Sequence, residues 1–199
     1  QHVERVPWVP FVGVHGGFLT GVDAETYLKT SNEIIKGVSK AIEIYNPDGI
    51  PVVFDLQIEA EILGCQLQWA PHNPPAVASH PLANGIKLTD LQIPKITDGR
   101  IPATLEATKS LRKKHPEIAL YGLITGPFTL ALHLMGTDIF MKLFEAPDEV
   151  NRVMQFCTQV GKKMAEYLIG AGCDIIAVVD PMTSQISPDH FEQFVTPFM

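Results

Sequence analysis

The sequence has no excess of basic residues. Its 199 residues carry 15 Lys and Arg against 22 Asp and Glu, which gives a formal net charge of −7. Surfaces that bind nucleic acid or anionic membranes need clustered Lys and Arg, so neither partner class is expected. The one basic cluster, Arg112 to His115, ends a predicted helix, where cations interact favourably with the helix dipole. We interpret it as a solvated helix end.

Cysteine is scarce, and no segment resembles a membrane-directing signal. Cys65, Cys157 and Cys173 are odd in number, widely spaced and set in apolar surroundings, which is typical of a reducing compartment. No apolar run approaches the ~20 residues that span a bilayer. Residues 1–8 lack the apolar core of a signal peptide. The sequence therefore predicts a globular, cytoplasmic protein.

Several motifs of cofactor and metal sites are also absent. Neither GxGxxG nor GxxxxGKS/T follows a predicted strand, which weakens a nucleotide-binding open sheet. HxC, CxxC and HExxH do not occur, and His72, His80 and His133 have no ligand-like spacing. We therefore expect no metal site made wholly within this chain.

Apolar runs alternate with helical patterns along the chain. Asp23 and Ser187 are expected N-caps, and Pro127, Pro147 and Pro188 suit a first helical turn. Nearly continuous apolar strands are typical of parallel sheets covered on both faces. Strands are predicted over 6–14, 51–54, 119–124 and 173–181, and helices over 24–45, 57–63, 103–115, 127–135, 138–144, 147–170 and from 188 onward.

Two architectures fit this order: an open doubly wound sheet and a (β/α)8 TIM barrel. A barrel needs about 250 residues, and four strands in 199 residues correspond to about half of one. The chain also has no initiator Met and stops soon after a new helix begins. We therefore expect an α/β fold in which residues 1–199 form a single domain, about the first half of a (β/α)8 barrel, with the C-terminal part absent.

Polar residues lie at the C-terminal ends of all four predicted strands, which is where a parallel α/β barrel carries its active-site residues. An unpaired carboxylate at such an end can point into a cleft, whereas burial on the strand itself would cost several kcal/mol. The residues at these ends are His15-Gly16-Gly17, Asp55, Thr125-Gly126-Pro127, and Asp180 with Met182 and Thr183.

The two aspartates also have structural explanations. Asp55 could cap the following helix through the amide of Gln57 or Ile58. Asp180, directly before a proline, could form a turn. Two carboxylates alone would also permit glycosidase-like chemistry, for which their separation in space decides.

The residues after the first predicted strand have alternatives as well. His15 could be an ordinary loop histidine. Gly16 and Gly17 could serve a tight turn, or their exposed amides could cradle an anion. The sequence leaves these alternatives open.

Three blocks of the sequence resemble the uroporphyrinogen decarboxylase (URO-D) superfamily. They are IPVVFDLQIEAEILGCQLQW, YGLITGPFTLALHLMG and AGCDIIAVVDPMTSQISPDHFEQFVTPFM, and the match spans most of residues 6–199. The superfamily holds the haem-pathway decarboxylase and zinc-dependent methyltransferases that act on methyl-corrinoid proteins or coenzyme M. The resemblance implies a (β/α)8 barrel that is longer than this chain.

Several positions favour the methyltransferase-like branch over the decarboxylase. In the decarboxylase an aspartate at the position of Asp55 holds pyrrole N–H groups, and arginines of the first loop grip the substrate carboxylates. The matching stretch here, FVGVHGGFLTG, has no arginine, so an octacarboxylate would meet no basic pocket. His133 stands where the decarboxylase has a tyrosine, and Pro181 stands where it has a serine.

The methyltransferase branch implies a corrinoid on a partner protein and a zinc ion that lowers the pKa of a bound thiol. The expected zinc ligands, a His-x-Cys pair and a later Cys, would lie beyond Met199. The resemblance thus implies methyl transfer between a corrinoid protein and a zinc-activated thiol or related acceptor. It implies Asp55 as the catalytic residue, and a cleft lined by His15, Gly16, Gly17, Gly126, His133, Asp180 and Met182.

Two alternative functions stay open. One is decarboxylation of uroporphyrinogen in porphyrin biosynthesis, which needs no cofactor. The other is a non-catalytic module that binds a tetrapyrrole or corrinoid. A half-barrel leaves two strand edges unpaired, and such edges pair with other chains. We therefore expect a homo-oligomer, and we expect residues 1–199 alone to be inactive.

Overall fold

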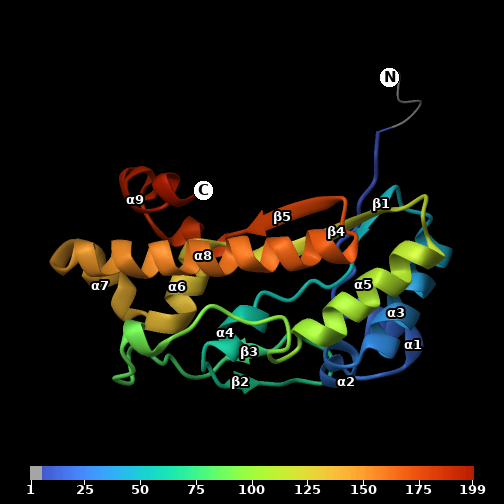
Figure 1. The fold of residues 1–199 in the computed structure, drawn as a ribbon, viewed down its shortest axis with the longest axis horizontal. Coiled ribbons are helices and arrows are strands. Elements are labelled where there is room, and N and C mark those ends of the chain that lie inside the picture. Colours follow the sequence, from blue (N-terminus) through green and yellow to red (C-terminus); the bar gives the residue numbers. More distant parts are fainter. Residues whose placement is uncertain (1–5) are drawn as a thin grey trace.

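The computed structural model describes residues 6–199 (Figure 1). Its α-helices are α1 (His15–Thr20), α2 (Ala24–Lys29), α3 (Ser31–Tyr45), α4 (Ile58–Ile62), α5 (Ile101–Lys114), α6 (Pro127–Met135), α7 (Asp138–Glu145), α8 (Pro147–Ala171) and α9 (Pro188–Phe194). Its strands are β1 (Gly49–Pro51), β2 (Leu67–Gln68), β3 (Ala76–Val77), β4 (Ala119–Thr125) and β5 (Ile175–Val179). Short 3-10 helices are η1 (Leu88–Asp90), η2 (Pro181–Gln185) and η3 (Thr196–Phe198).

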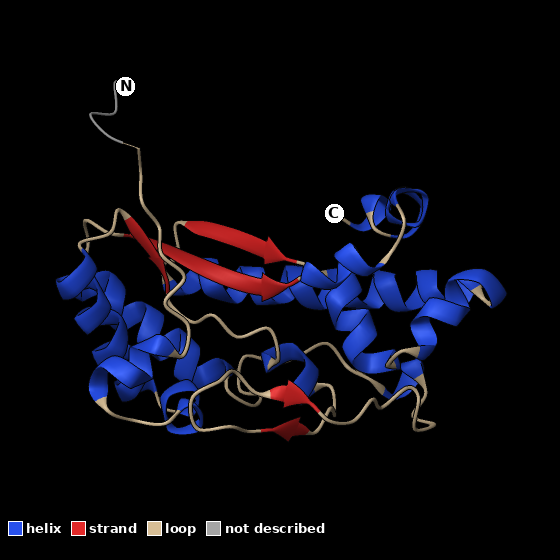
Figure 2. Cartoon of the chain, turned by 180° about the vertical axis from the view of Figure 1, so that it is seen from behind, coloured by secondary structure: helices blue, strands red, loops and turns tan. Residues whose placement is uncertain are grey.

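The main sheet is parallel, with strand order β1-β4-β5. Gly49 pairs with Ala119, and Tyr121 pairs with Ile175. Helices α4 and α5 lie between β1 and β4 in the chain, and α6 to α8 lie between β4 and β5. Figures 1 and 2 show α8 running along the sheet. Strands β2 and β3 form a separate antiparallel ribbon. Parallel strands joined through helices confirm the predicted α/β organisation.

Alternate residues of β4 face the helices that cover the sheet. Leu120 and Ile124 are buried, whereas Tyr121 is half-buried on the other face. At Gly122, a Cβ would lie 3.0 Å from the side chain of Leu168 in α8. The period of two along the strand therefore places one set of side chains in the core beneath α8.

The longest helix of the described chain is α8, with 25 residues. Its exposed face carries charged side chains, among them Lys162 and Glu166. Of the helices in residues 6–199, none is both long and apolar enough to cross a membrane.

The prediction of a strand over 6–14 is wrong for these residues. Pro7 and Pro10 have no N–H to donate to a ladder, and the segment is held at Trp8 instead. Asp48 N donates to Trp8 O at 2.9 Å, and Trp8 N donates to Asp48 Oδ2 at 2.7 Å. The apolar pattern is present, but the prolines prevent regular pairing.

Two further predictions have displaced boundaries. The strand predicted over 51–54 is β1, which ends at Pro51, and Val52 N adds one bond to Tyr121 O at 3.0 Å. The helix predicted over 24–45 is divided into α2 and α3 at Thr30, whose φ of −123° and ψ of 116° are extended. The helices predicted over 57–63, 103–115, 127–135, 138–144 and 147–170, and the one from 188, are confirmed within a few residues as α4 to α9.

Both predicted N-caps are confirmed. Asp23 Oδ1 accepts a hydrogen bond from Thr26 N at 2.9 Å. Ser187 Oγ accepts one from His190 N at 3.2 Å. Each side chain satisfies a backbone N–H of the first helical turn that has no partner within its helix.

The prediction that the basic cluster is a solvated helix end is wrong for Arg112, which is bonded to neighbouring segments. Its Nε donates to Gly172 O at 3.1 Å, its Nη1 donates to Ile118 O at 3.2 Å, and it forms an ion pair with Asp174. Asp174 Oδ2 also accepts a hydrogen bond from Leu120 N at 2.7 Å. Arg112 therefore joins the end of α5 to the starts of β4 and β5.

We expect Gly37→Ala to destabilise the protein. Gly37 of α3 lies under α1, and a Cβ there would be 2.6 Å from Gly16 O and 2.6 Å from the ring of Tyr27. Such overpacking costs about 1–3 kcal/mol, which exceeds the gain of about 0.5–1 kcal/mol from replacing a helical glycine. Urea unfolding measures the change in the free energy of unfolding.

The matched control is Gly170→Ala in α8. Nothing lies within 4 Å of a Cβ at Gly170, so only the helix propensity changes. We expect the free energy of unfolding to stay constant or to rise by up to about 1 kcal/mol. Equal effects of the two substitutions would show that α1 does not pack closely on Gly37.

Candidate functional site

Polar side chains connect the C-terminal ends of the three strands of the main sheet. Asp55 follows β1, Thr125 ends β4, and Asp180 follows β5. Glu59 of α4 contacts Thr125, and Asp180 contacts the first turn of α6, directly after β4. The three strand ends therefore meet at one edge of the sheet, as the parallel arrangement requires.

Asp55 is fully buried, with 0% of its side chain exposed. One carboxylate oxygen forms an ion pair with Arg100, and the other accepts a hydrogen bond from Gln57 N at 2.8 Å. The hydrogen bond from the backbone amide of Gln57 is the one that the capping alternative predicts. Because both oxygens are engaged inside the protein, Asp55 holds the loop before α4 and does not reach an open cleft. This geometry fits a positioning role, and the catalytic role stays a prediction.

Sequence reasoning missed Arg100. This residue is 6% exposed, its Nε donates to Glu61 Oε2 at 2.6 Å, and its guanidinium lies 5.2 Å from the ring centroid of Trp69. Its Nη2 is buried without a hydrogen-bond partner. A signal did exist, because an aspartate in an apolar run needs a cation and Arg100 is the one arginine in residues 6–111.

Glu59 is a second buried acid that sequence reasoning did not assign to the site. It is 2% exposed. Its Oε1 accepts a hydrogen bond from Thr125 N at 3.0 Å, and its Oε2 accepts one from Thr125 Oγ1 at 2.9 Å. Burial raises the pKa of Glu59, the charge of Asp55 adds to the rise, and the bonds from Thr125 oppose it. Glu59 therefore holds a proton more firmly than an exposed glutamate does.

Asp180 holds the first turn of α6. Its Oδ2 accepts a hydrogen bond from Phe128 N at 3.0 Å. Its Oδ1 accepts bonds from Thr129 N at 2.7 Å and Thr129 Oγ1 at 2.5 Å. Its backbone carbonyl accepts a bond from Thr183 Oγ1 at 2.7 Å, so the predicted turn also forms. An acid at this position satisfies unpaired amides and complements the positive end of the helix dipole.

Gly126 and Met182 lie beside this contact. A Cβ on Gly126 would overlap the side chain of Asp180, so the close approach of the two strand ends requires glycine. Met182 N donates to Thr129 Oγ1 at 3.2 Å. The structure thus brings Gly126, Asp180 and Met182 together, three of the seven residues predicted to line the cleft.

His133 lies farther along α6, in other surroundings. Its carbonyl oxygen accepts hydrogen bonds from His80 Nδ1 at 2.8 Å and Cys65 Sγ at 3.3 Å. Burial, together with the nearby His80, lowers the pKa of His133 to about 4, so its imidazole is neutral at physiological pH. None of these contacts reaches the acids at the strand ends, so a place for His133 in the same cleft stays a prediction.

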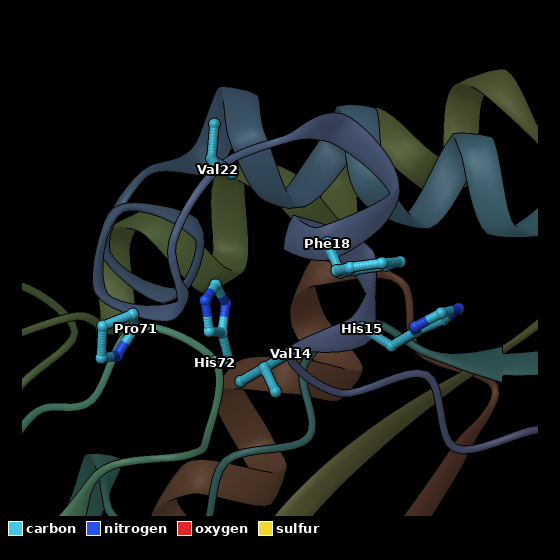
Figure 3. A pocket seen from close by; sticks show the side chains of 6 residues that line it. All are labelled: Val14, His15, Phe18, Val22, Pro71 and His72. Carbon is cyan, nitrogen blue, oxygen red and sulfur yellow. The ribbon is translucent and has the colours of Figure 1, made fainter.

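His15 contacts α3 and not the strand-end acids. Its Nε2 lies 2.7 Å from Tyr45 Oη, and its ring is stacked with that of Phe18 at 5.7 Å between centroids. His15 and Phe18 line a hollow of about 290 Å³ together with Val14, Val22, Pro71 and His72 (Figure 3). Figure 3 shows the ring of His15 directed away from His72, so the two imidazoles do not converge on one point.

Gly16 and Gly17 serve the packing of α1. Their amides donate to Gly13 O at 3.2 Å and Val14 O at 3.0 Å, which leaves neither amide free to cradle an anion. A Cβ on either glycine would press on Tyr27. This corrects the anion-binding alternative. The prediction that the two glycines border the cleft is not supported by any contact with the strand-end acids in residues 6–199.

The described residues do not fit a zinc site. In residues 6–199, no group of three or more His, Cys, Asp and Glu side chains is placed to hold a metal ion. Burial raises the pKa of Cys65 and of Cys173 to about 12, and it also raises that of Cys157. Zinc binds thiolates, and these thiols are held in the protonated form.

Sequence comparison relates the chain to a known family. The family model "Uroporphyrinogen decarboxylase (URO-D)" matches residues 1–199. Methylcobamide:CoM methyltransferase MtbA of Methanosarcina acetivorans is 30% identical over 155 residues, which cover 76% of this chain and 46% of that protein. Methylcobamide:CoM methyltransferase MtaA of Methanosarcina barkeri is 31% identical over 163 residues, 78% of this chain and 48% of that protein. A uroporphyrinogen decarboxylase of Geobacter sulfurreducens is 26% identical over 165 residues, 79% and 47% of the two chains.

A solved structure of a methyltransferase from Methanosarcina mazei shares the fold. The TM-score is 0.89 at 26% sequence identity, over 100% of this chain and 61% of that one. Together with the parallel sheet, this likeness confirms the predicted fold class, a partial α/β barrel. The chain spans about half the length of the curated relatives it matches.

We expect Arg100→Gln to lower the free energy of unfolding by about 3–5 kcal/mol, because it leaves the charge of Asp55 buried without a cation. The double variant Asp55→Asn/Arg100→Gln is expected to recover part of this loss, since no buried charge remains. Arg152→Gln, at an exposed arginine of α8, is the matched control and is expected to change stability by less than about 0.5 kcal/mol. Denaturant unfolding measures all three variants, and similar losses for Arg100 and Arg152 would contradict a buried ion pair.

Glu59 is expected to give stability a pH dependence of defined sign. The pKa of Glu59 is raised above its ordinary value of 4.5, so the folded state binds the proton more tightly than the unfolded state. The contribution of Glu59 to stability is therefore greatest below pH 4.5 and is lost as pH rises through its folded pKa. Glu59→Gln, which keeps an acceptor for Thr125 N, is expected to remove this fall, whereas the exposed Glu106→Gln retains it. Melting temperatures measured from acid to neutral pH check the difference, and parallel curves for the two variants would refute it.

Proposed function

The chain belongs to the uroporphyrinogen decarboxylase (URO-D) family, and we propose that the protein containing it is a methyltransferase that moves a methyl group between a corrinoid protein and a thiol acceptor. The observation that carries this proposal is the order of similarity. The two methylcobamide:CoM methyltransferases are 30% and 31% identical to the chain, whereas the decarboxylase is 26% identical.

The charges at the strand ends support methyl transfer over decarboxylation. Arg100 is already neutralised by Asp55 and Glu61. The segment from His15 to Gly21 contains no Lys or Arg. The octacarboxylate substrate of a decarboxylase would thus find no unpaired Lys or Arg at these strand ends to offset its negative charge. A corrinoid, whose side chains end largely in neutral amides, needs no such cation.

Aromatic side chains next to Asp55 offer a surface for a macrocycle. Phe11 is 62% exposed, and its ring lies 5.4 Å from that of Phe54 between centroids. Aromatic faces bind extended planar groups through large apolar contacts. We place the corrinoid contact of this part of the protein at Phe11 and Phe54.

The acids of the site act by positioning in this proposal. The pair of Asp55 and Arg100 fixes the chain after β1, and Asp180 fixes η2 against the start of α6. Glu59, whose pKa is raised by burial, accepts hydrogen bonds from Thr125 at the end of β4. Strand ends held in this way keep the mouth of the barrel in one geometry, which favours orientation of two reactants.

A zinc ion that activates the thiol would need ligands outside residues 6–199, since the described part of the chain does not fit the metal. When bound, such an ion lowers the pKa of a thiol and so supplies the attacking thiolate. The cytoplasmic location and the homo-oligomeric state stay predictions.

The test uses the full-length protein with methylcobalamin and coenzyme M. We expect loss of methylcobalamin that depends on the thiol, with formation of the methyl thioether, and about one zinc per chain after dialysis. Chelation is expected to stop the transfer while leaving the fold of residues 6–199 intact, because these residues do not hold the ion. Decarboxylation of uroporphyrinogen without methyl transfer would overturn the proposal, and corrinoid binding with neither reaction would favour a binding module.

A pair of phenylalanine variants tests the proposed corrinoid surface. Phe11→Ala is expected to raise the KM for the corrinoid by about 3- to 10-fold, as the loss of one aromatic contact predicts. Phe144→Ala is the control, because Phe144 is 71% exposed on α7, far from β1 in Figure 1. Equal KM values for the two variants would exclude a contact at Phe11.

A further inference from the structure

A second polar hollow lies on the outer side of the fold, away from the strand-end acids. Its volume is about 510 Å³, and its lining includes Thr20 of α1, Lys36, Ser39 and Lys40 of α3, and Lys114 and His115 at the end of α5. His115 precedes β4, whereas the strand-end acids contact the residue that ends β4. The seven residues of β4 separate the two places by about 20 Å.

Two side chains in this hollow, His115 and Lys114, converge on the hydroxyl of Ser39. His115 Nε2 lies 3.2 Å from Ser39 Oγ, and Lys114 Nζ donates to the same oxygen at 3.1 Å. On the far side of the imidazole, Glu117 Oε1 lies 3.9 Å from His115 Nδ1. The order of groups is carboxylate, imidazole, hydroxyl, with an ammonium group beside the hydroxyl.

The protonation of these groups suits proton transfer from the serine. Burial lowers the pKa of His115, Lys114 lowers it further, and Glu117 raises it in part, so the imidazole is neutral at pH 7. Glu117 lies beyond hydrogen-bond distance of Nδ1, but its negative charge on that side favours the tautomer with the proton on Nδ1. That tautomer leaves Nε2 as an acceptor for the serine proton. Lys114 Nζ donates a hydrogen bond to Ser39 Oγ, so its positive charge would stabilise negative charge that develops on that oxygen.

We propose that Ser39 is a nucleophile activated by His115, and that this hollow hydrolyses small carboxylic esters that carry a further negative charge. Ser39 Oγ forms a bond to the ester carbonyl carbon while its proton passes to His115 Nε2. The bond to the leaving alcohol then breaks, and the alcohol takes that proton. Water, deprotonated by His115, cleaves the acyl-serine and restores the hydroxyl. This arrangement follows the general logic of a nucleophile, a base and a group that orients the base.

The charge of the hollow determines the substrate class. Three lysines line it, together with Glu43. Lys36 is ion-paired with Glu33 and Lys40 with Glu43, whereas Lys114 donates to Ser39 Oγ and so places its positive charge beside the proposed nucleophile. An ester whose acyl group ends in a carboxylate therefore gains an attraction that a neutral ester lacks. Lys114 and Glu117 from the segment of His115, and Lys36, Lys40 and Glu43 from α3, are the charged groups that set the pH response.

The first experiment treats the full-length protein with a fluorophosphonate and locates the adduct by peptide mass spectrometry. We expect labelling of Ser39, loss of labelling in Ser39→Ala, and at least about 100-fold slower labelling in His115→Asn, which removes the base. Ser110→Ala is the matched control, because Ser110 lies on α5 and makes no hydrogen bond to a histidine in the described residues. Ser39 is half-buried on a helix, so its alanine variant is expected to fold, and circular dichroism checks this.

The second experiment compares p-nitrophenyl hemisuccinate with p-nitrophenyl acetate. We expect a higher kcat/KM for the hemisuccinate, and a rate that rises with pH to half its maximum below the ordinary histidine pKa of 6.5. Glu117 is a positioning residue, so Glu117→Gln is expected to slow the reaction a few-fold and to move the rise to lower pH. Labelling of a lysine in place of Ser39, no labelling of folded protein, or hydrolysis unchanged in Ser39→Ala would each overturn the proposal. Methyl transfer is measured separately and does not enter these outcomes.

Discussion

A carboxylate that leaves water must find hydrogen-bond donors or a cation, and this requirement organises the sheet. Asp55 pairs with Arg100 and accepts a hydrogen bond from the amide of Gln57. Glu59 accepts hydrogen bonds from the amide and hydroxyl of Thr125, and Asp180 accepts them from the first turn of α6. Each partner comes from a different element of the fold. Burial of an unpaired charge would cost several kcal/mol, so each acid connects two segments that are distant in the sequence.

An exposed acid holds the opposite end of the sheet. There Asp174, directly before β5, forms an ion pair with Arg112 and accepts a hydrogen bond from the amide of Leu120, near the start of β4. Strand β4 is therefore held at both ends by acids from neighbouring segments, and its buried face is covered by α8. A sheet fixed at both ends holds the side chains at its C-terminal strand ends in one geometry. A reaction between two bound partners requires such a fixed geometry.

The family relationship and the electrostatics lead to the same choice of chemistry. An acidic chain whose strand-end arginine is neutralised offers little to a polyanionic substrate. It offers more to a neutral macrocycle, through the aromatic side chains of Phe11 and Phe54. The hollow at Ser39 differs in both charge and position, because lysines line it and because it lies near the start of β4. The fold thus carries two chemically distinct surfaces.

The sequence by itself determined the elements with a strong period and clear ends. Strand β4 follows from a nearly continuous apolar run. Helices α5 to α9 follow from helical periodicity, from prolines in first turns and from the cap at Ser187, because these signals act within one or two turns of chain. It also placed Asp55 and Asp180 at strand ends. Only the tertiary structure decided that Asp55 is buried with Arg100, 45 residues away, that Thr30 divides a helix, and that His15 contacts Tyr45. The physical reason is that pairing of charges and packing of glycines depend on approach in space, which local periodicity does not encode.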